Sequence, residues 1–418
     1  MSWSQRVFTL LAILVIATGA WWALGGVTLV RGTDAMQSLR GEVDTLWGRP
    51  LEVRAPQALF LTQRTERRVA SVDDGQGGTR SEDHDEVVTV ENAVPVATTT
   101  VAVRIDEDVR RKGLTWFPLY AATFEGTWTW EVPEGAEGPL HLRWQFPDPE
   151  GDYDAFEVVV NGQPRSEGLN PVAGTIAITL PCRPGDTMTL QLRFRLRGQE
   201  VFRYRAHDGV SELRDFVLTI DTDVLGYDLP EDALSPGSVA TDGGRAALTW
   251  HFDRMVTGKA VGLVVPTPVQ PGELAAALSF SAPISLAFYL VWITAVGALR
   301  DVHLSALALA LVSASFFAFH LTFAYTADRL PAEVSFAIAS AVSLALAIPY
   351  LARIAGWRFA LGPAGLAQWV YLVGFSAAHF AEGWTGLTLT AISVLTLGAI
   401  MHLTASLERS SPLQILDP

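Results

Sequence analysis

Cysteine is almost absent from this 418-residue chain, because Cys182 is the only one. A single cysteine excludes an intrachain disulfide, a thiolate metal site and a thioredoxin-like pair. The chain also lacks the G-x-S-x-G, P-loop and H-E-x-x-H signatures of hydrolases, nucleotide-binding proteins and zinc proteases. We therefore expect neither a cofactor nor a bound metal, and we interpret the chain as non-enzymatic.

Positive charge is scarce in the last third of the chain. Residues 275–418 hold five Arg, no Lys and six acidic residues. The net charge of −14 falls entirely within residues 31–274, which carry 24 basic and 38 acidic side chains. Because binding to phosphates needs clustered Lys or Arg, this acidic region argues against nucleic acid or anionic lipid as its partner.

What the last third does have is a series of long apolar runs. A bilayer's hydrocarbon core is about 30 Å thick and a helix rises about 1.5 Å per residue, so about twenty apolar residues span it. Backbone groups in hydrocarbon must be paired internally, which predicts a helix for each run. The five predicted spans are Ala277–Leu299, Val302–Ala324, Ala332–Ile354, Phe359–Ala381 and Gly386–Leu407.

A sixth apolar run, Val7–Val30, follows a short start that carries Arg6. It could be a signal peptide with a weak cleavage site at residues 18–20, or a retained anchor. The apolar character of Trp21–Val30 favours the anchor. Counting Arg in short loops then predicts both termini in the cytoplasm and residues 31–274 in the periplasm. The arginines that this topology places inside are Arg6, Arg300, Arg353, Arg358 and Arg409, and the one placed outside is Arg329.

The predicted organisation is a membrane protein of mixed α and β structure. It has a cytoplasmic start with an anchor helix, a periplasmic β-rich domain that resembles an antiparallel sandwich, a five-helix transmembrane bundle and a cytoplasmic tail. The predicted boundaries of these four parts are 1–30, 31–274, 275–408 and 409–418.

The β prediction rests on alternation and turn chemistry. Residues Thr123–Glu131 place Phe124, Gly126, Trp128 and Trp130 on one face, as in a sheet with one buried face. Asn-Gly at positions 161–162 predicts a type I′ hairpin turn. Before these strands, Asp34–Leu46 has a weak helical pattern that ends at residues 46–50, and Leu51–Thr62 is predicted as a strand.

Two stretches of this region allow a functional as well as a structural interpretation. Ser71–Glu86 is predicted as a polar loop, although its Asp83–Glu86 cluster could ligate a metal. The aromatic side chains could stack on glycans or fill the core of a sandwich, and the core is the favoured interpretation. The aromatic residues in question are Trp116, Trp128, Trp130 and Trp144.

The predicted outer ends of the spans hold ionisable residues, which are costly inside a bilayer. They could form a polar cluster beneath the periplasmic domain that senses pH, since histidine titrates near neutrality. Interfacial side chains and helix–helix hydrogen bonds are the structural alternative. The candidate residues are His320, Asp328, Glu333, His379 and Glu382.

Two stretches resemble the CreD family of bacterial inner-membrane proteins. One is Leu46–Gly48 with Pro50, followed by Ala55 and Pro56; the other runs from Arg110 to Leu114, through Phe117–Tyr120, to Gly126. Other stretches typical of that family are missing near Asp221–Asp228, Thr294–Val296 and Ala324–Thr326. The chain thus resembles a divergent member. The resemblance implies an inner-membrane location and a role in cell-envelope integrity or envelope stress, and it implies no reaction.

We therefore expect a non-enzymatic protein embedded in the lipid bilayer, whose periplasmic domain binds a protein or glycan partner. A transporter or channel subunit formed by the five helices is the alternative. A membrane enzyme centred on His320 and His379 is the third hypothesis. The sequence leaves the oligomeric state open.

Overall fold

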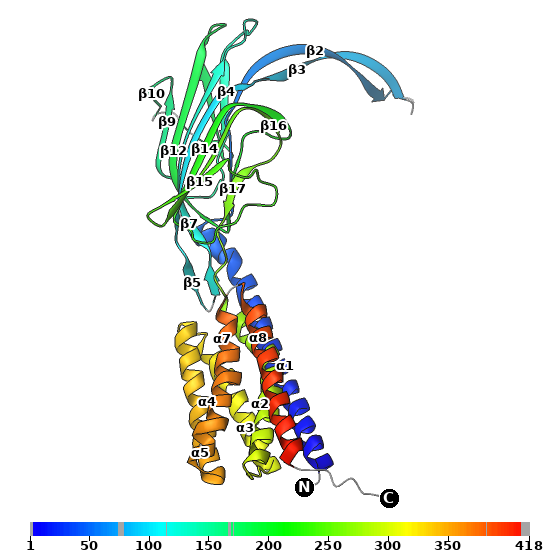
Figure 1. Ribbon diagram of the computed structural model, residues 1–418. Helices are drawn as coiled ribbons and strands as arrows, with labels where there is room; N and C mark the ends of the chain where they lie inside the picture. The colour runs from blue at the N-terminus through cyan, green and yellow to red at the C-terminus, as the bar shows by residue number, and fades with distance from the viewer. Residues whose placement is uncertain are drawn as a thin grey trace, which may run out of the picture. The chain divides into compact units, whose positions relative to one another are not determined.

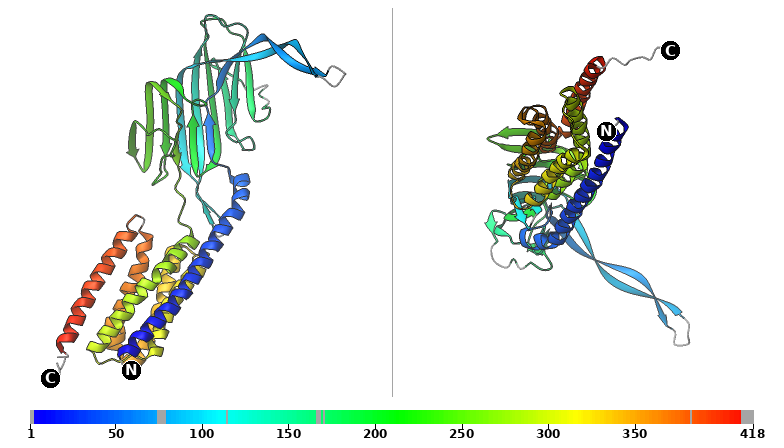
Figure 2. Two further views of the ribbon diagram at one scale, coloured as in Figure 1. Left: turned by 90° about the vertical axis from the view of Figure 1, so that its right-hand side faces the viewer. Right: turned by 90° about the horizontal axis from the view of Figure 1, so that it is seen from below.

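The computed structural model describes residues 3–73, 79–113, 115–165, 169, 171–381 and 383–410. The chain forms two compact units (Figures 1 and 2). The helical unit contains Met1–Leu39, Lys112–Thr115 and Val269–Pro418, and the β-rich unit contains Arg40–Arg111 and Trp116–Pro268. An N-terminal helix, a β-rich middle region and C-terminal helices were all predicted, and the structure confirms this order.

Five helices of the described chain are long and apolar enough to cross a membrane. They are α1 (Trp3–Trp47), α2 (Pro271–Leu299), α3 (Ala306–Thr326), α4 (Ala332–Ala355) and α8 (Thr385–Ser410). The first helix includes both the predicted anchor and the helical pattern of residues 34–46, and it ends at Trp47, directly before Gly48. Within the helical unit, the start of α1 and the end of α8 lie at the same end (Figure 1).

The single helix predicted for Phe359–Ala381 is replaced by short α, π and 3-10 segments. Gly362 leaves helical geometry with ψ of −106°, and Pro363 next to it has no N–H to donate. Turns of π-helix are rare and often lie at functional positions. The segments are α5 (Trp357–Phe359), η1 (Ala360–Ala364), α6 (Gly365–Gln368), η2 (Trp369–Gly374), α7 (Phe375–Ala377) and η3 (Ala378–Phe380).

Polar side chains join the helices inside the unit. Ser343 Oγ donates to the Ser315 carbonyl at 2.6 Å, and Gln368 Nε2 donates to Ser343 Oγ at 3.1 Å. Ser285 donates to the carbonyl of Tyr371 in η2. All of these side chains are buried. Small hydroxyl residues allow helices to approach closely in a membrane, and their hydrogen bonds tie one helix to the next.

The described strands form four sheets, three of them within the β-rich unit. The largest has the strand order β10-β9-β12-β7-β4-β14-β16-β15; the others are β11-β8-β2-β3, β1-β13-β17 and β5-β6. Most neighbours are antiparallel, as predicted, but β4 pairs with β14 and β1 with β13 in parallel. The purely antiparallel prediction was wrong for these two pairs, whose long sequence separation leaves no local signal.

The strands of this unit vary widely in length. They are β1 (Leu51–Arg54), β2 (Gln57–Asp73), β3 (Thr79–Val94), β4 (Val96–Glu107), β5 (Arg110–Lys112), β6 (Thr115–Phe117), β7 (Leu119–Glu131), β8 (Leu140–Gln145), β9 (Asp154–Val160), β10 (Gln163–Pro164), β11 (Thr175–Leu180), β12 (Thr187–Gln199), β13 (Val201–Arg205), β14 (Ser211–Thr222), β15 (Ser238–Asp242), β16 (Arg245–Thr257) and β17 (Val261–Val264).

The alternation predicted in β7 is confirmed, with Phe124, Trp128 and Trp130 fully buried. Gly126 leaves room for the indole of Trp128, because a Cβ there would lie 2.2 Å from that ring. Trp144 is buried as well, so three of the four tryptophans considered as a glycan platform belong to the core. The Asn161–Gly162 turn joins β9 to β10 with φ of 50° and 74°, as a type I′ turn requires.

The loop predicted for Ser71–Glu86 was wrong. Strands β2 and β3 pair from Ala58 opposite Val94 as far as Asp73 opposite Thr79, and the resulting ribbon projects from the other sheets of its unit (Figures 1 and 2). The side chains of Asp83 and His84, from the candidate metal cluster, lie outside the described residues. Asp85 of that cluster is 3.7 Å from Arg67. Among the described residues, no group of three or more potential ligands could hold a metal.

His207, between β13 and β14, gives the β-rich unit a predictable response to acid. Burial lowers the pKa of His207 below 6.5, against smaller opposing effects of the Glu212 backbone and the Asp208 charge. The unfolded chain therefore binds this proton more readily than the folded one. Stability from this group is complete above about pH 6.5 and declines as the pH falls toward the lower folded-state pKa. His207→Gln should flatten the stability profile below about pH 6.5 in denaturant titrations. An unchanged profile would show that His207 contributes nothing there.

Candidate functional site

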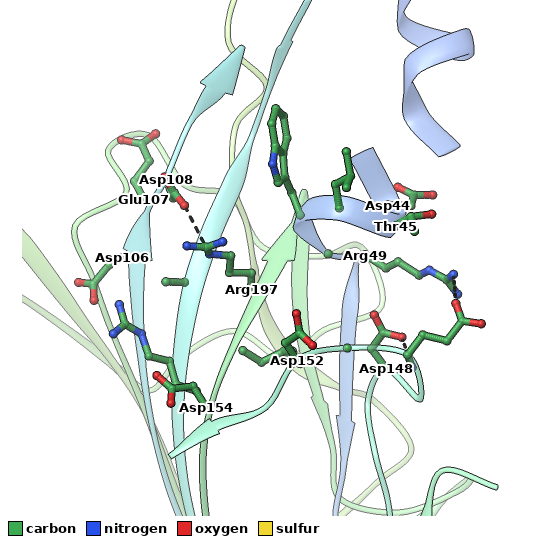
Figure 3. A pocket seen from close by; sticks show the side chains of 18 residues that line it. Asp44, Thr45, Arg49, Asp106, Glu107, Asp108, Asp148, Asp152, Asp154 and Arg197 are labelled. Atoms are coloured by element: carbon green, nitrogen blue, oxygen red, sulfur yellow. Dashed lines mark hydrogen bonds and ion pairs between the residues drawn. The ribbon is translucent and has the colours of Figure 1, made fainter. Parts of the chain in front are cut away.

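The described residues of the β-rich unit enclose a cavity of about 560 Å³ beside the last turn of α1. The end of α1, the end of β4, the loop between β8 and β9, and β12 form its walls (Figure 3). Its lining residues are Asp44, Thr45, Leu46, Trp47, Gly48, Arg49, Asp106, Glu107, Asp108, Ala121, Asp148, Glu150, Gly151, Asp152, Asp154, Arg195, Leu196 and Arg197. Cavities of about 300–1,000 Å³ are the usual size of ligand sites.

Negative charge dominates the lining, with eight carboxylates and three guanidiniums. Arg49 Nη2 is 2.7 Å from Glu150 Oε2 at one side, and Arg197 Nε is 4.0 Å from Asp108 Oδ2 at the other (Figure 3). Asp44 accepts a hydrogen bond from the buried amide of Gln199. The walls retain an excess of five negative charges, which would attract a cation.

Gly48 closes the wall between α1 and β12. Its φ of +111° is in a region that side chains rarely adopt, and a Cβ there would lie 2.5 Å from the carbonyl oxygen of Arg197. The backbone can approach this closely only because the residue is glycine. Gly48 therefore fixes where α1 ends and where Arg49 begins the next wall.

Trp47 connects this wall to β5. The guanidinium carbon of Arg110 lies 5.7 Å from the centroid of the Trp47 ring, within the range of a cation–π contact. Arg110 Nη2 is also 2.7 Å from Asp108 Oδ2, a lining residue. The two stretches that carry the resemblance, around residues 46–50 and 110–126, thus meet beside the same cavity.

The loop between β8 and β9 is held by internal hydrogen bonds. The Tyr153 hydroxyl donates to the Asp148 carbonyl at 2.9 Å and accepts from the Asp148 amide at 2.9 Å. Burial raises the pKa of Tyr153, so this hydroxyl stays neutral at physiological pH. Asp148 in turn accepts from the Glu150 amide at 3.0 Å, which keeps its carboxylate at the cavity.

No sequence motif pointed to this cavity. Its acidic residues are concentrated at positions 106–108 and 148–154, and that density was the available signal. Their convergence depends on long-range strand pairing, such as that of β12 with β7, which no local pattern reveals.

The described residues of the predicted outer polar cluster differ in their surroundings. His320 and His379 lie close enough to interact electrostatically. Asp328 forms an ion pair with Arg31 of α1. Glu333 is exposed at the start of α4, and Glu382 lies outside the described residues.

His320 is buried against aromatic rings. Its Nδ1 lies 2.8 Å from the Phe316 carbonyl, which can only accept, so the proton is on Nδ1 and Nε2 is an acceptor. Among the described residues, Nε2 has no hydrogen-bond partner, and neither has the buried Nε1 of Trp21, whose ring centroid is 5.4 Å away. Unsatisfied buried groups of this kind are typical of sites that hold water or a ligand.

Comparison with known proteins gives little further information. No protein-family model and no curated protein sequence matches the chain. Among solved structures, a protein from Legionella pneumophila subsp. pneumophila str. Philadelphia 1, provisionally described as nutrient-binding, is similar over 54% of this chain and 82% of its own. The two are 12% identical with a TM-score of 0.27, which is too low to carry an argument.

Proposed function

We propose that this chain is a non-enzymatic, multi-pass protein of the bacterial inner membrane, similar to the CreD family, with a role in the cell envelope. Residues 31–274 form its periplasmic, sandwich-like domain, and both termini are cytoplasmic. The five apolar helices, with the segmented helical path of residues 357–380 as a sixth crossing, and the distribution of arginine between short loops support this arrangement.

The β-rich domain binds a partner through the acidic cavity at the end of α1. The observation that carries this proposal is a cavity of about 560 Å³ with an excess of five negative charges in its walls. A neutral glycan gains nothing from such a field, whereas a Lys- or Arg-containing segment of an envelope protein does. Of the two partner classes expected, protein or glycan, the charge therefore favours a protein.

Removing one carboxylate from the cavity should weaken the binding of a cationic probe. We expect Asp152→Asn to reduce the affinity for a short Lys-rich peptide about threefold to tenfold, since a partly exposed ion pair contributes about 1 kcal/mol. Asp242→Asn, in the exposed strand β15, is the matched control and should change nothing. Calorimetry on the detergent-solubilised full chain, repeated at raised salt, provides the measurement. Equal affinity in both variants, or stronger binding of an uncharged glycan fragment, would contradict the proposal.

A transporter or channel subunit is the second candidate, favoured by the broken helical path at Gly362 and the buried Gln368. Replacing this glutamine by leucine removes its hydrogen bond to Ser343, but it also removes the buried Oε1, which has no hydrogen-bond partner among the described residues. These two effects oppose each other, so stability should change by no more than about 1 kcal/mol. If the helices transport, Gln368→Leu should nevertheless reproduce the phenotype of a deletion strain. Thr294→Val, which removes only a hydroxyl bonded within α2, is the control. Normal function of Gln368→Leu at normal protein level would exclude a transport role for this residue.

A further inference from the structure

The ribbon of β2 and β3 is bare along one edge. Strand β2 pairs with β8 only from Gln57 to Leu59, whereas its pairing with β3 continues to Asp73. Beyond Leu59, the other edge of β2 has no partner strand among the described residues. Side chains from Leu61 to Arg67 are exposed or, at Glu66, half-buried. An isolated two-stranded ribbon is marginally stable in water, and an unpaired edge is a template for another strand.

Within one chain, the charged side chains of β2 do not all lie opposite unlike charges on β3. Glu66 lies directly opposite Glu86, and like charges in that position are destabilising. Arg64, two residues earlier on the same face, lies opposite Val88. Arg67 on the other face is 3.7 Å from Asp85. A strand added to the bare edge could therefore place a cation beside Glu66 and an anion beside Arg64.

We propose that the bare edge of β2 pairs with the same edge of a second copy of this chain, antiparallel, with the two-fold axis at Thr65. Arg64 of each copy then lies opposite the partner's Glu66, and Gln63 opposite the partner's Arg67. Two residues that lie directly opposite each other in a sheet point to the same face, whereas successive residues of one strand point to opposite faces. The two-fold axis must therefore pass at a residue, which then lies opposite its own symmetry mate, and not between two residues. Placing it at Arg64, Glu66 or Arg67 would oppose two like charges. Among positions 64–67, Thr65 is the axis that brings unlike charges together without opposing two like charges.

Disulfide crosslinking tests this register. In a full-length Cys182→Ser background, Thr65→Cys should form a disulfide-linked dimer under mild oxidation in native membranes, because the two cysteines face each other across the axis. Gln63→Cys is the matched control: its symmetry mate is four residues along the strand, about 13 Å away, too far for a disulfide. Monomer only at position 65, equal dimer at both positions, or a crosslink to a different protein would overturn the proposal.

A charge exchange tests the partner's identity independently of cysteine geometry. In the Thr65→Cys background, R64E or E66R alone should lower dimer yield at least about fivefold, since each opposes like charges twice per dimer. The double variant R64E/E66R restores two unlike pairs and should return the yield to its starting value. If the single variants crosslink normally, or if the double variant stays monomeric, the two-fold pairing at Thr65 is wrong.

Discussion

Replacing Trp128 by alanine should destabilise the β-rich unit by about 3–5 kcal/mol, the usual cost of removing a buried tryptophan. The side chain is fully buried in β7, and its Nε1 donates to the Tyr204 hydroxyl at 2.9 Å. The Trp128 and Phe124 rings are stacked, with their centroids 6.2 Å apart. The substitution would leave both a large void and a buried hydroxyl without its donor. The apparent melting temperature of this unit in detergent should fall by about 10 °C.

Two further variants separate these contributions. Tyr204→Phe removes only the acceptor of the Trp128 hydrogen bond and should cost about 1–3 kcal/mol. Val239→Ala, at an exposed position in β15, should change stability by less than about 0.5 kcal/mol. If Trp128→Ala melted within a degree or two of the unchanged protein, the proposed core of this unit would be wrong.

Gly48→Ala should both destabilise the β-rich unit and deform its cavity. The residue has φ of +111°, and an added Cβ would meet the Arg197 carbonyl oxygen at 2.5 Å. A side-chain rotation can relieve neither the clash of the added Cβ with the β12 backbone nor the strain of the positive φ. The chain after α1 must therefore shift. We expect a loss of about 3 kcal/mol, at the upper end of ordinary single substitutions, together with weaker binding of the Lys-rich peptide.

Gly135→Ala is the matched glycine control. Nothing lies within 4 Å of a Cβ added there, so its stability and peptide affinity should stay unchanged. Chemical denaturation followed by tryptophan fluorescence measures the first quantity, and calorimetry the second. Full stability and full peptide binding in Gly48→Ala would contradict the description of the cavity wall.

Much of the fold could be predicted because its signals are local. Alternation in residues 123–131 marked the buried face of β7, and Asn161–Gly162 marked a hairpin turn. Apolar length identified the helices. The break at Gly362 was missed because an apolar run looks the same whether its helix is regular or contains π turns.

Other features could not be predicted because they have no periodic apolar signal or depend on distant pairing. Residues 61–67 of β2 have exposed or half-buried side chains on both faces, and Ser71–Glu86 has no apolar period, so Ser71–Glu86 resembled a loop. The cavity unites residues 44–49, 106–108, 148–154 and 195–197, which only the completed sheet brings together. For the predicted outer cluster, the structure brings His320 and His379 close enough to interact electrostatically. The sequence alone could not show that Asp328 forms an ion pair with Arg31.

The most direct test of the whole account asks which side of the membrane each unit faces. In a Cys182→Ser background, Asp242→Cys marks the β-rich unit, and His303→Cys marks the exposed connection between α2 and α3. A membrane-impermeant maleimide should label the first in intact cells whose outer membrane has been opened, and the second only after the inner membrane is permeabilised. Labelling of position 303 in intact cells with position 242 protected, or release of the protein by alkaline carbonate, would contradict a membrane-embedded chain with an exported acidic domain.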